Sequence, residues 1–92
     1  MNISDEILKE LAYVQMSRHR TKIMETLKKE PEIPSKIAKK SGINPNNVSN
    51  TIKQLRNHEL VECVNPEYKM GRLYRLTDKG KNVAENLEIR II

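Results

Sequence analysis

Residues 35–58 decide the fold, and they read SKIAKKSGINPNNVSNTIKQLRNH. The first part predicts a short helix that stops at Gly42, because glycine readily adopts the left-handed conformation that ends many helices. Asn44 is a good N-cap and Pro45 is favoured at a first helical position, so a second helix is predicted from here to about His58. Two helices joined by so short a glycine-containing turn are typical of a helix-turn-helix motif. The expected core of this motif is Ile37, Ala38, Ile43, Val48, Ile52 and Leu55.

The residues before this motif predict two more helices. Ser4 can cap a first helix, whose acidic first turn suits the helix dipole. Ser17 can cap a second helix with apolar residues at helical spacing, although the sequence also permits one continuous helix. The prolines within residues 30–34 end the second helix.

The residues after the motif predict a β-hairpin and a last helix. Residues 60–64 and 73–76 are predicted strands, and the turn between them contains Gly71. Thr77 is expected to cap a helix that runs to the C-terminus. The chain is therefore expected to be mostly α with a small β-hairpin, in the order α-α-α-α-β-β-α. This is a winged helix-turn-helix, formed as a single domain over residues 1–92.

Positive charge is concentrated in two segments. The net charge is +5, yet residues 33–58 and 68–77 contain no Asp or Glu and together hold eight Lys and Arg. Clustered basic residues suit a polyanion, because they displace condensed counterions from phosphates. Charge alone fits DNA, RNA or an acidic membrane surface, and also a merely solvated surface.

Several other classes of protein are disfavoured by composition. The single cysteine, Cys63, permits no internal disulfide and no multi-cysteine metal site. The first residues lack the apolar core of a signal peptide, and no apolar run approaches a membrane span. The residues form no catalytic constellation or glycine-rich phosphate loop. We therefore expect a cytoplasmic protein that is not an enzyme and has neither cofactor nor metal.

The second helix of the motif carries the candidate base-reading face. Opposite its apolar stripe lie short amides, hydroxyls and a lysine, side-chain types that hydrogen-bond base edges in the major groove. The alternative is an ordinary solvated polar face. The candidate residues are Asn46, Asn47, Ser49, Asn50, Lys53, Gln54 and Asn57.

The candidate contacts to the DNA backbone lie on the first helix of the motif and on the hairpin. The predicted wing, residues 66–72, carries a basic tip that can follow a phosphate or enter a minor groove. Arg75 can instead pair with an acid of the protein. These candidates are Ser35, Lys36, Lys39, Lys69, Arg72 and Arg75.

These segments resemble the small winged-helix transcription regulators of the ArsR/MarR-like group, especially their short archaeal versions. The resemblance rests on SRHRTKIMETL, on PSKIAKKSGINPNNVSNTIKQLRNHELV and on GRLYRLTDKGK, within residues 17–87. It implies a homodimer on a pseudo-palindromic operator, with base-reading positions on the second helix and Arg72 at the wing tip. The chain lacks the paired cysteines and ligand sets of the metal sensors. It is also shorter than most MarR proteins, so neither metal sensing nor drug binding is inferred.

The terminal segments, residues 1–14 and 78–92, are the expected dimerisation elements. The alternative is that both helices pack on their own core. The expected interface residues are Ile7, Leu8, Leu11, Val83, Leu87 and Ile91. The favoured function is that of a sequence-specific regulator that binds double-stranded DNA, with the helix over residues 45–58 in the major groove. The alternative is a winged-helix module for protein–protein interaction.

Overall fold

The structure, a computed structural model, describes residues 3–91. Met1, Asn2 and Ile92, which belong to the expected terminal elements, lie outside the described residues. The order of elements is the expected one and confirms the winged helix-turn-helix. The elements are α1 (Asp5–Gln15), α2 (Arg18–Lys29), α3 (Pro34–Ser41), α4 (Pro45–Asn57), β1 (Val61–Cys63), β2 (Tyr74–Leu76) and α5 (Asp78–Glu85).

Side-chain caps set the starts of four helices, as the sequence predicts. Ser4 accepts a hydrogen bond from the Ile7 backbone N–H at the start of α1. Ser17 caps α2 in the same way, in an extended conformation that separates α1 from α2. Asn44 caps α4 and Thr77 caps α5. Each cap satisfies a backbone N–H that has no partner within its helix.

The turn between α3 and α4 is fixed by Gly42 and Ser41. Gly42 has a φ of 72°, the left-handed conformation that ends α3. The buried Ser41 hydroxyl donates to the Ile37 carbonyl (2.6 Å) and accepts from the Ile43 backbone N–H (3.3 Å). Ile37 and Ile43 are themselves buried. Ser41 thus hydrogen-bonds to residues on both sides of Gly42, and this turn sets the orientation of α4 relative to α3.

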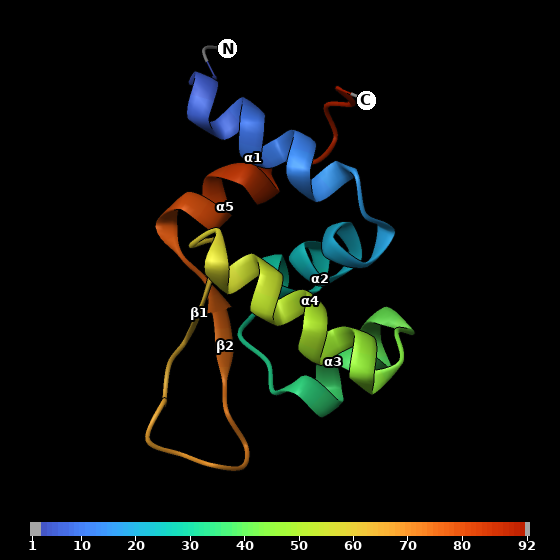
Figure 1. Ribbon diagram of the computed structural model, residues 1–92, viewed down its shortest axis with the longest axis vertical. Helices are drawn as coiled ribbons and strands as arrows, with labels where there is room; N and C mark the ends of the chain where they lie inside the picture. The colour runs from blue at the N-terminus through green and yellow to red at the C-terminus, as the bar shows by residue number, and fades with distance from the viewer. Residues whose placement is uncertain (1–2, 92) are drawn as a thin grey trace.

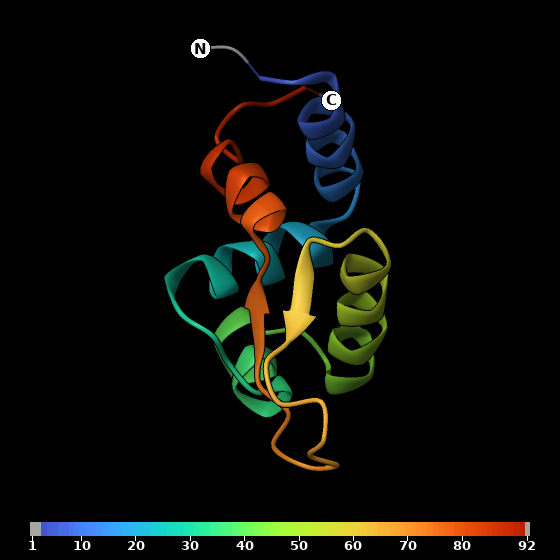
Figure 2. The ribbon, with the colours of Figure 1, turned by 90° about the vertical axis from the view of Figure 1, so that its left-hand side faces the viewer.

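The hairpin is short, and the segment before α3 pairs with its second strand. β1 and β2 pair antiparallel, with Glu62 opposite Arg75 and Cys63 opposite Tyr74. Glu32 forms an isolated bridge on the other edge of β2, where it exchanges two backbone hydrogen bonds of 3.0 Å with Tyr74. The predicted loop before α3 therefore ties the hairpin to the helical body. Figure 2 shows the two strands beside the helices, with the connecting wing loop extending beyond them.

The two ends of the molecule are formed by different elements. In Figure 1, α1 and α5 lie together at the top and the wing extends from the bottom, with α4 in front of α2 between them. The fully buried large side chains come from the helices and from the residue just before β1. They are Leu11, Val14, Ile23, Met24, Ile37, Val48, Leu55, Leu60 and Val83.

The C-terminal helix is shorter than expected. The prediction of a helix to the C-terminus is wrong, because α5 ends at Glu85. Asn86 turns its side-chain amide back to the Asn82 carbonyl, and an acid at position 85 is unfavourable at the negative end of a helix dipole. Beyond it the chain is held by Gln15, whose side-chain amide bonds backbone groups of Ile89 and Ile91.

The predicted dimer residues divide into two groups. Ile7, Leu11 and Val83 are buried within the single chain, so they form its own core and are not free to form an interface. This part of the expectation is corrected, because α1 packs directly on α5. Leu8 and Leu87 are half-buried, and Ile91 is exposed.

Candidate nucleic-acid interface

The outer face of α4 is exposed and free of acids. One side of α4 packs into the core through Val48, Ile52 and Leu55, as expected, and Thr51 is buried with them. The structure thus confirms the placement of the candidate face, while its base-reading role remains a prediction. All seven candidates are exposed: Asn46, Asn47, Ser49, Asn50, Lys53, Gln54 and Asn57.

One flank of this face is held by Arg20 of α2. Its guanidinium donates to the Gln54 side-chain oxygen (3.1 Å) and to the Tyr13 carbonyl (2.8 Å). It also lies over the Tyr13 ring, 3.8 Å from the centroid, a favourable cation–π arrangement. The amide oxygen of Gln54 is therefore already bound within the protein. Sequence reasoning missed Arg20, because no local pattern in α2 predicts a contact with α4.

The C-terminal end of α4 is anchored to α1. The His58 ring stacks on Tyr13 with centroids 3.6 Å apart, and its Nδ1 lies 2.8 Å from a Glu10 carboxylate oxygen. The other Glu10 oxygen accepts from Lys79 (2.9 Å). Burial raises the pKa of Glu10, but the hydrogen bonds from His58 and Lys79 outweigh this effect and hold that pKa below its ordinary value. The orientation of α4 thus depends on α1 and α5.

Helix α3 presents three of the predicted backbone contacts, two in its first turn and one in its last. Ser35, Lys36 and Lys39 are all exposed there. Lys40, in contrast, pairs with Glu30 (3.2 Å) and with the buried Glu32. The hydrogen bond to Glu32 is the main reason that the pKa of Lys40 is raised. Lys40 therefore holds α3 to the preceding loop.

A notch of about 230 Å³ separates α4 from the hairpin. Its lining includes Ser49 and Lys53, two of the candidate contacts, together with Arg56. The Arg56 guanidinium lies 5.8 Å from the centroid of the Tyr74 ring. Sequence reasoning did not select Arg56, although it belongs to the acid-free segment. The notch brings three polar or basic side chains of α4 next to β2.

The wing is held together by its own side chains. Asn65 donates to the Gly71 carbonyl (3.2 Å) and accepts from the Leu73 backbone N–H (2.7 Å). Arg72 donates to the carbonyls of Tyr68 (2.6 Å) and Pro66 (3.3 Å). The guanidinium of Arg72 therefore folds back onto the loop, while the expected DNA contact of this residue stays a prediction.

The two other basic residues of the hairpin differ from each other. Arg75 pairs with Glu62 across the strands at 2.8 Å, which was the stated alternative to a DNA contact. Lys69 is exposed near the wing tip. Among the described residues, Arg72 and Arg75 bond within the protein, whereas Lys69 makes neither a hydrogen bond nor an ion pair.

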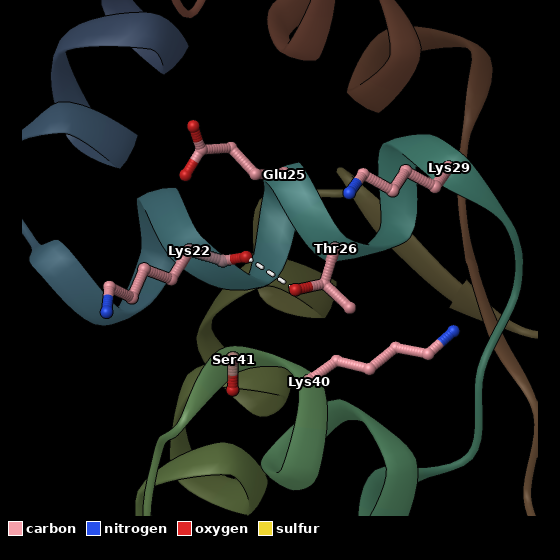
Figure 3. Close-up of a pocket in the computed structure, with 6 residues that line it drawn as sticks. All are labelled: Lys22, Glu25, Thr26, Lys29, Lys40 and Ser41. Carbon is pink, nitrogen blue, oxygen red and sulfur yellow. Dashed lines mark hydrogen bonds between the residues drawn. The ribbon is translucent and has the colours of Figure 1, made fainter.

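A larger groove lies outside this interface. It has a volume of about 660 Å³ between α2 and α3, and Figure 3 shows its lining. Three of its six lining side chains are already engaged within the protein: the Thr26 hydroxyl donates to the Lys22 carbonyl (2.9 Å), Ser41 to Ile37, and Lys40 to its two acids. No residue of α4 or of the wing lines it. We therefore do not assign it to the candidate interface.

Two further tests concern other kinds of site. Within residues 3–91, His, Cys, Asp and Glu side chains nowhere gather in groups of three or more that could hold a metal ion. In the same part of the chain, none of the helices has the length and apolar character needed to cross a membrane.

Comparison with protein families identifies the fold by sequence as well. The profile of the winged helix-turn-helix family matches residues 18–91. The chain therefore belongs to the winged helix-turn-helix family. Comparison with curated proteins gives no significant match.

Solved structures of the same fold include transcription regulators. A mutant of ZitR from Lactococcus lactis is 27% identical with a TM-score of 0.68, over 76% of this chain and 49% of that one. A MarR family transcriptional regulator from Silicibacter pomeroyi is 18% identical with a TM-score of 0.70, over 91% and 62%. This chain thus spans about half the length of that ZitR chain.

A third structure is that of a homodimer. It is a winged helix-turn-helix DNA-binding domain from Mycobacterium bovis, described as belonging to a possible ArsR-family transcriptional regulator. It is 21% identical with a TM-score of 0.66, over 95% of this chain and 82% of that one. The resemblance to MarR and ArsR proteins is thereby confirmed at the level of the fold.

Proposed function

We propose that this chain is a transcription regulator that binds specific sequences of double-stranded DNA. The observation that carries the proposal is the outer face of α4, which is exposed, acid-free and rich in amides. Asn side chains can form paired hydrogen bonds with adenine, and Lys can reach guanine or a phosphate. An α-helix of this kind fits the major groove, and α4 is the second helix of a helix-turn-helix motif.

The positions of α3 and the wing support the same docking. In Figure 2 the tip of the wing leans to the side on which α4 lies. A duplex against α4 would therefore also meet the wing and the exposed start of α3. We assign Ser35, Lys36 and Lys39 to the phosphates beside the major groove and the wing to the neighbouring backbone or minor groove. The proposed role is one of binding rather than catalysis, and a cytoplasmic location would follow from the DNA partner.

We propose that the DNA-bound form is a homodimer. The homodimeric domain from Mycobacterium bovis has the same fold, which supports this state. Met16, Ile89 and Ile91 are exposed, and Gln15 holds the segment of the two isoleucines against the end of α1. We assign the dimer interface to these three residues and to the half-buried Leu8 and Leu87, in place of the buried Ile7, Leu11 and Val83. Two copies would then read half-sites about 34–36 Å apart.

Fluorescence anisotropy tests the DNA proposal. The duplexes are the region upstream of the chain's own gene and a scrambled version, across a salt series. We expect tighter binding to the upstream duplex, a steep loss of affinity with salt, and a slope lowered by about 1 in Lys53→Ala. Asn50→Ala should weaken specific binding by about 1–3 kcal/mol. Lys81→Ala is the matched control, because this exposed lysine lies on α5.

The other outcomes are equally informative. Equal, salt-sensitive binding to both duplexes would contradict specificity for this region and favour an architectural DNA-binding protein. No binding to either duplex at low salt would refute the DNA proposal and favour the protein–protein module. Sedimentation with and without the duplex tests the dimer, which a strictly monomeric complex would refute.

A further inference from the structure

The tip of the wing is apolar as well as basic. Met70 is 86% exposed and Tyr68 is 56% exposed, and Lys69 stands between them. Single exposed apolar residues are ordinary on protein surfaces. Here, however, two large ones lie on a loop that extends away from the body of the molecule (Figures 1 and 2). Nothing within the described chain covers them.

The loop that carries these side chains is preformed. Asn65 closes its base through Gly71 and Leu73, as described above. Arg72 bonds two carbonyls of the opposite limb, and Gly71 supplies the positive φ of 68° that the turn requires. A loop held by these four hydrogen bonds loses little freedom on binding, and preorganisation of this kind favours affinity.

Because Arg72 bonds within the wing, other side chains form the surface that the wing presents to a partner. With that guanidinium on the Tyr68 and Pro66 carbonyls, the tip exposes the side chains of Tyr68, Lys69 and Met70. The acid of this loop, Glu67, precedes the tip. An apolar tip flanked by a cation suits a partner that is anionic at its edge and apolar inside. The minor groove of DNA has this chemistry, with phosphates at its rims and apolar base faces that become accessible where a base step opens.

We propose that Met70, supported by Tyr68, enters the minor groove and wedges between neighbouring base pairs. Apolar side chains that enter between base steps unstack them partly and kink the duplex toward the major groove. Lys69 then lies against a phosphate, and Arg72 acts as a positioning residue that stiffens the wing. The inference rests on the proposed function, since it places the wing on the DNA that α4 binds.

Affinity and bending measurements with variants of Met70 test the wedge. The probe is a 40-base-pair duplex from the upstream region with a fluorophore at each end, so that energy transfer reports bending. Met70→Ala should weaken binding about tenfold, or about 1.4 kcal/mol, and should reduce the bend with an unchanged salt slope. Met70→Leu should retain both. Because this side chain is exposed, an unchanged melting temperature serves as the folding control.

Variants of the two basic residues separate a phosphate contact from positioning. Lys69→Ala should lower the salt slope by about 1 and leave the bend in place. Arg72→Lys should weaken binding as much as Arg72→Ala, because a lysine lacks the planar fork whose Nε and terminal nitrogen reach the Tyr68 and Pro66 carbonyls. Binding by Arg72→Lys at the wild-type level would overturn the positioning role and make Arg72 a phosphate contact.

The wedge and the proposed function fail in different ways. If the wild-type chain binds and Met70→Ala binds and bends the duplex equally well, the wedge alone is overturned. If the wild-type chain binds no duplex, both proposals are overturned. Met70 would then be a candidate contact to a protein partner.

Discussion

The approach of α5 to the hairpin requires a glycine at position 80. A Cβ atom added to Gly80 would lie 1.9 Å from the Leu60 carbonyl oxygen and 2.9 Å from its carbon. Ordinary van der Waals contact begins at 3.4 Å. The Leu60 backbone cannot simply yield, because its carbonyl accepts from the Thr77 N–H at 3.1 Å and its side chain is fully buried. Gly80→Ala must therefore move α5 away from Leu60.

The expected cost follows from what this movement disturbs. Overpacking of this kind costs about 1–3 kcal/mol, and the loss of the Thr77 hydrogen bond adds about 1 kcal/mol. Alanine returns about 1 kcal/mol through its better helix propensity. The net expectation is a free energy of unfolding lower by about 1–3 kcal/mol.

Urea unfolding followed by circular dichroism at 222 nm measures this difference. Asn82→Ala is the matched control, because position 82 is exposed on the same helix and alanine should stabilise it by about 0.5 kcal/mol. A Gly80→Ala chain as stable as the wild type, with a normal control, would refute the close approach of α5 to Leu60.

Two further predictions concern the contacts that orient α4. Glu10→Gln should lower the free energy of unfolding at pH 7 by about 1–2 kcal/mol, because its hydrogen bonds to His58 and Lys79 lose a charged partner. Since the pKa of Glu10 is lower in the folded chain, its contribution is present above the ordinary value of 4.5 and is lost as the pH falls through the folded-state pKa. Urea titrations at pH 7 and pH 3 should therefore give a smaller difference between the two chains at pH 3, and an equal difference would contradict the assignment. Ser41→Ala should cost about 1–2 kcal/mol in thermal unfolding, because the buried Ile43 loses the partner of its N–H, and an unchanged melting temperature would count against the turn as described.

Local chemistry explains which parts of the fold the sequence predicts. The caps at Ser4, Ser17, Asn44 and Thr77 were all predicted, because a cap depends on residues within one turn of itself. The left-handed stop at Gly42 was predicted for the same reason. The acid-free face of α4 followed from helical periodicity, which sequence spacing records directly.

Contacts between distant segments could not be predicted in this way. The bond between Arg20 and Gln54 joins residues on separate helices, and no spacing rule brings them together. The pairing of Glu32 with Tyr74 adds a partner to the hairpin from a segment that the prolines mark only as a helix end. From the sequence, Gly80 is only a residue of low helix propensity. Glycine is required there because the Leu60 carbonyl lies where a Cβ atom would be.

The same limit explains why the packing of two further groups of residues could not be predicted. An apolar stripe on α1 or α5 looks the same whether it faces its own core or a second copy, so the burial of Ile7, Leu11 and Val83 had to come from packing. An arginine beside a glycine in a hairpin looks free in the sequence. Only the path of the loop shows that Arg72 faces the carbonyls of Tyr68 and Pro66.

An NMR titration tests the central claim most directly, namely that α4 and the wing together form the DNA interface. The ¹⁵N-labelled chain would be titrated with the upstream duplex while amide shifts are followed. The account predicts the largest changes in residues 46–57 and 67–72, with small changes at Lys22 and Lys29 in the groove between α2 and α3. Large changes at that groove, with α4 and the wing unaffected, would contradict it.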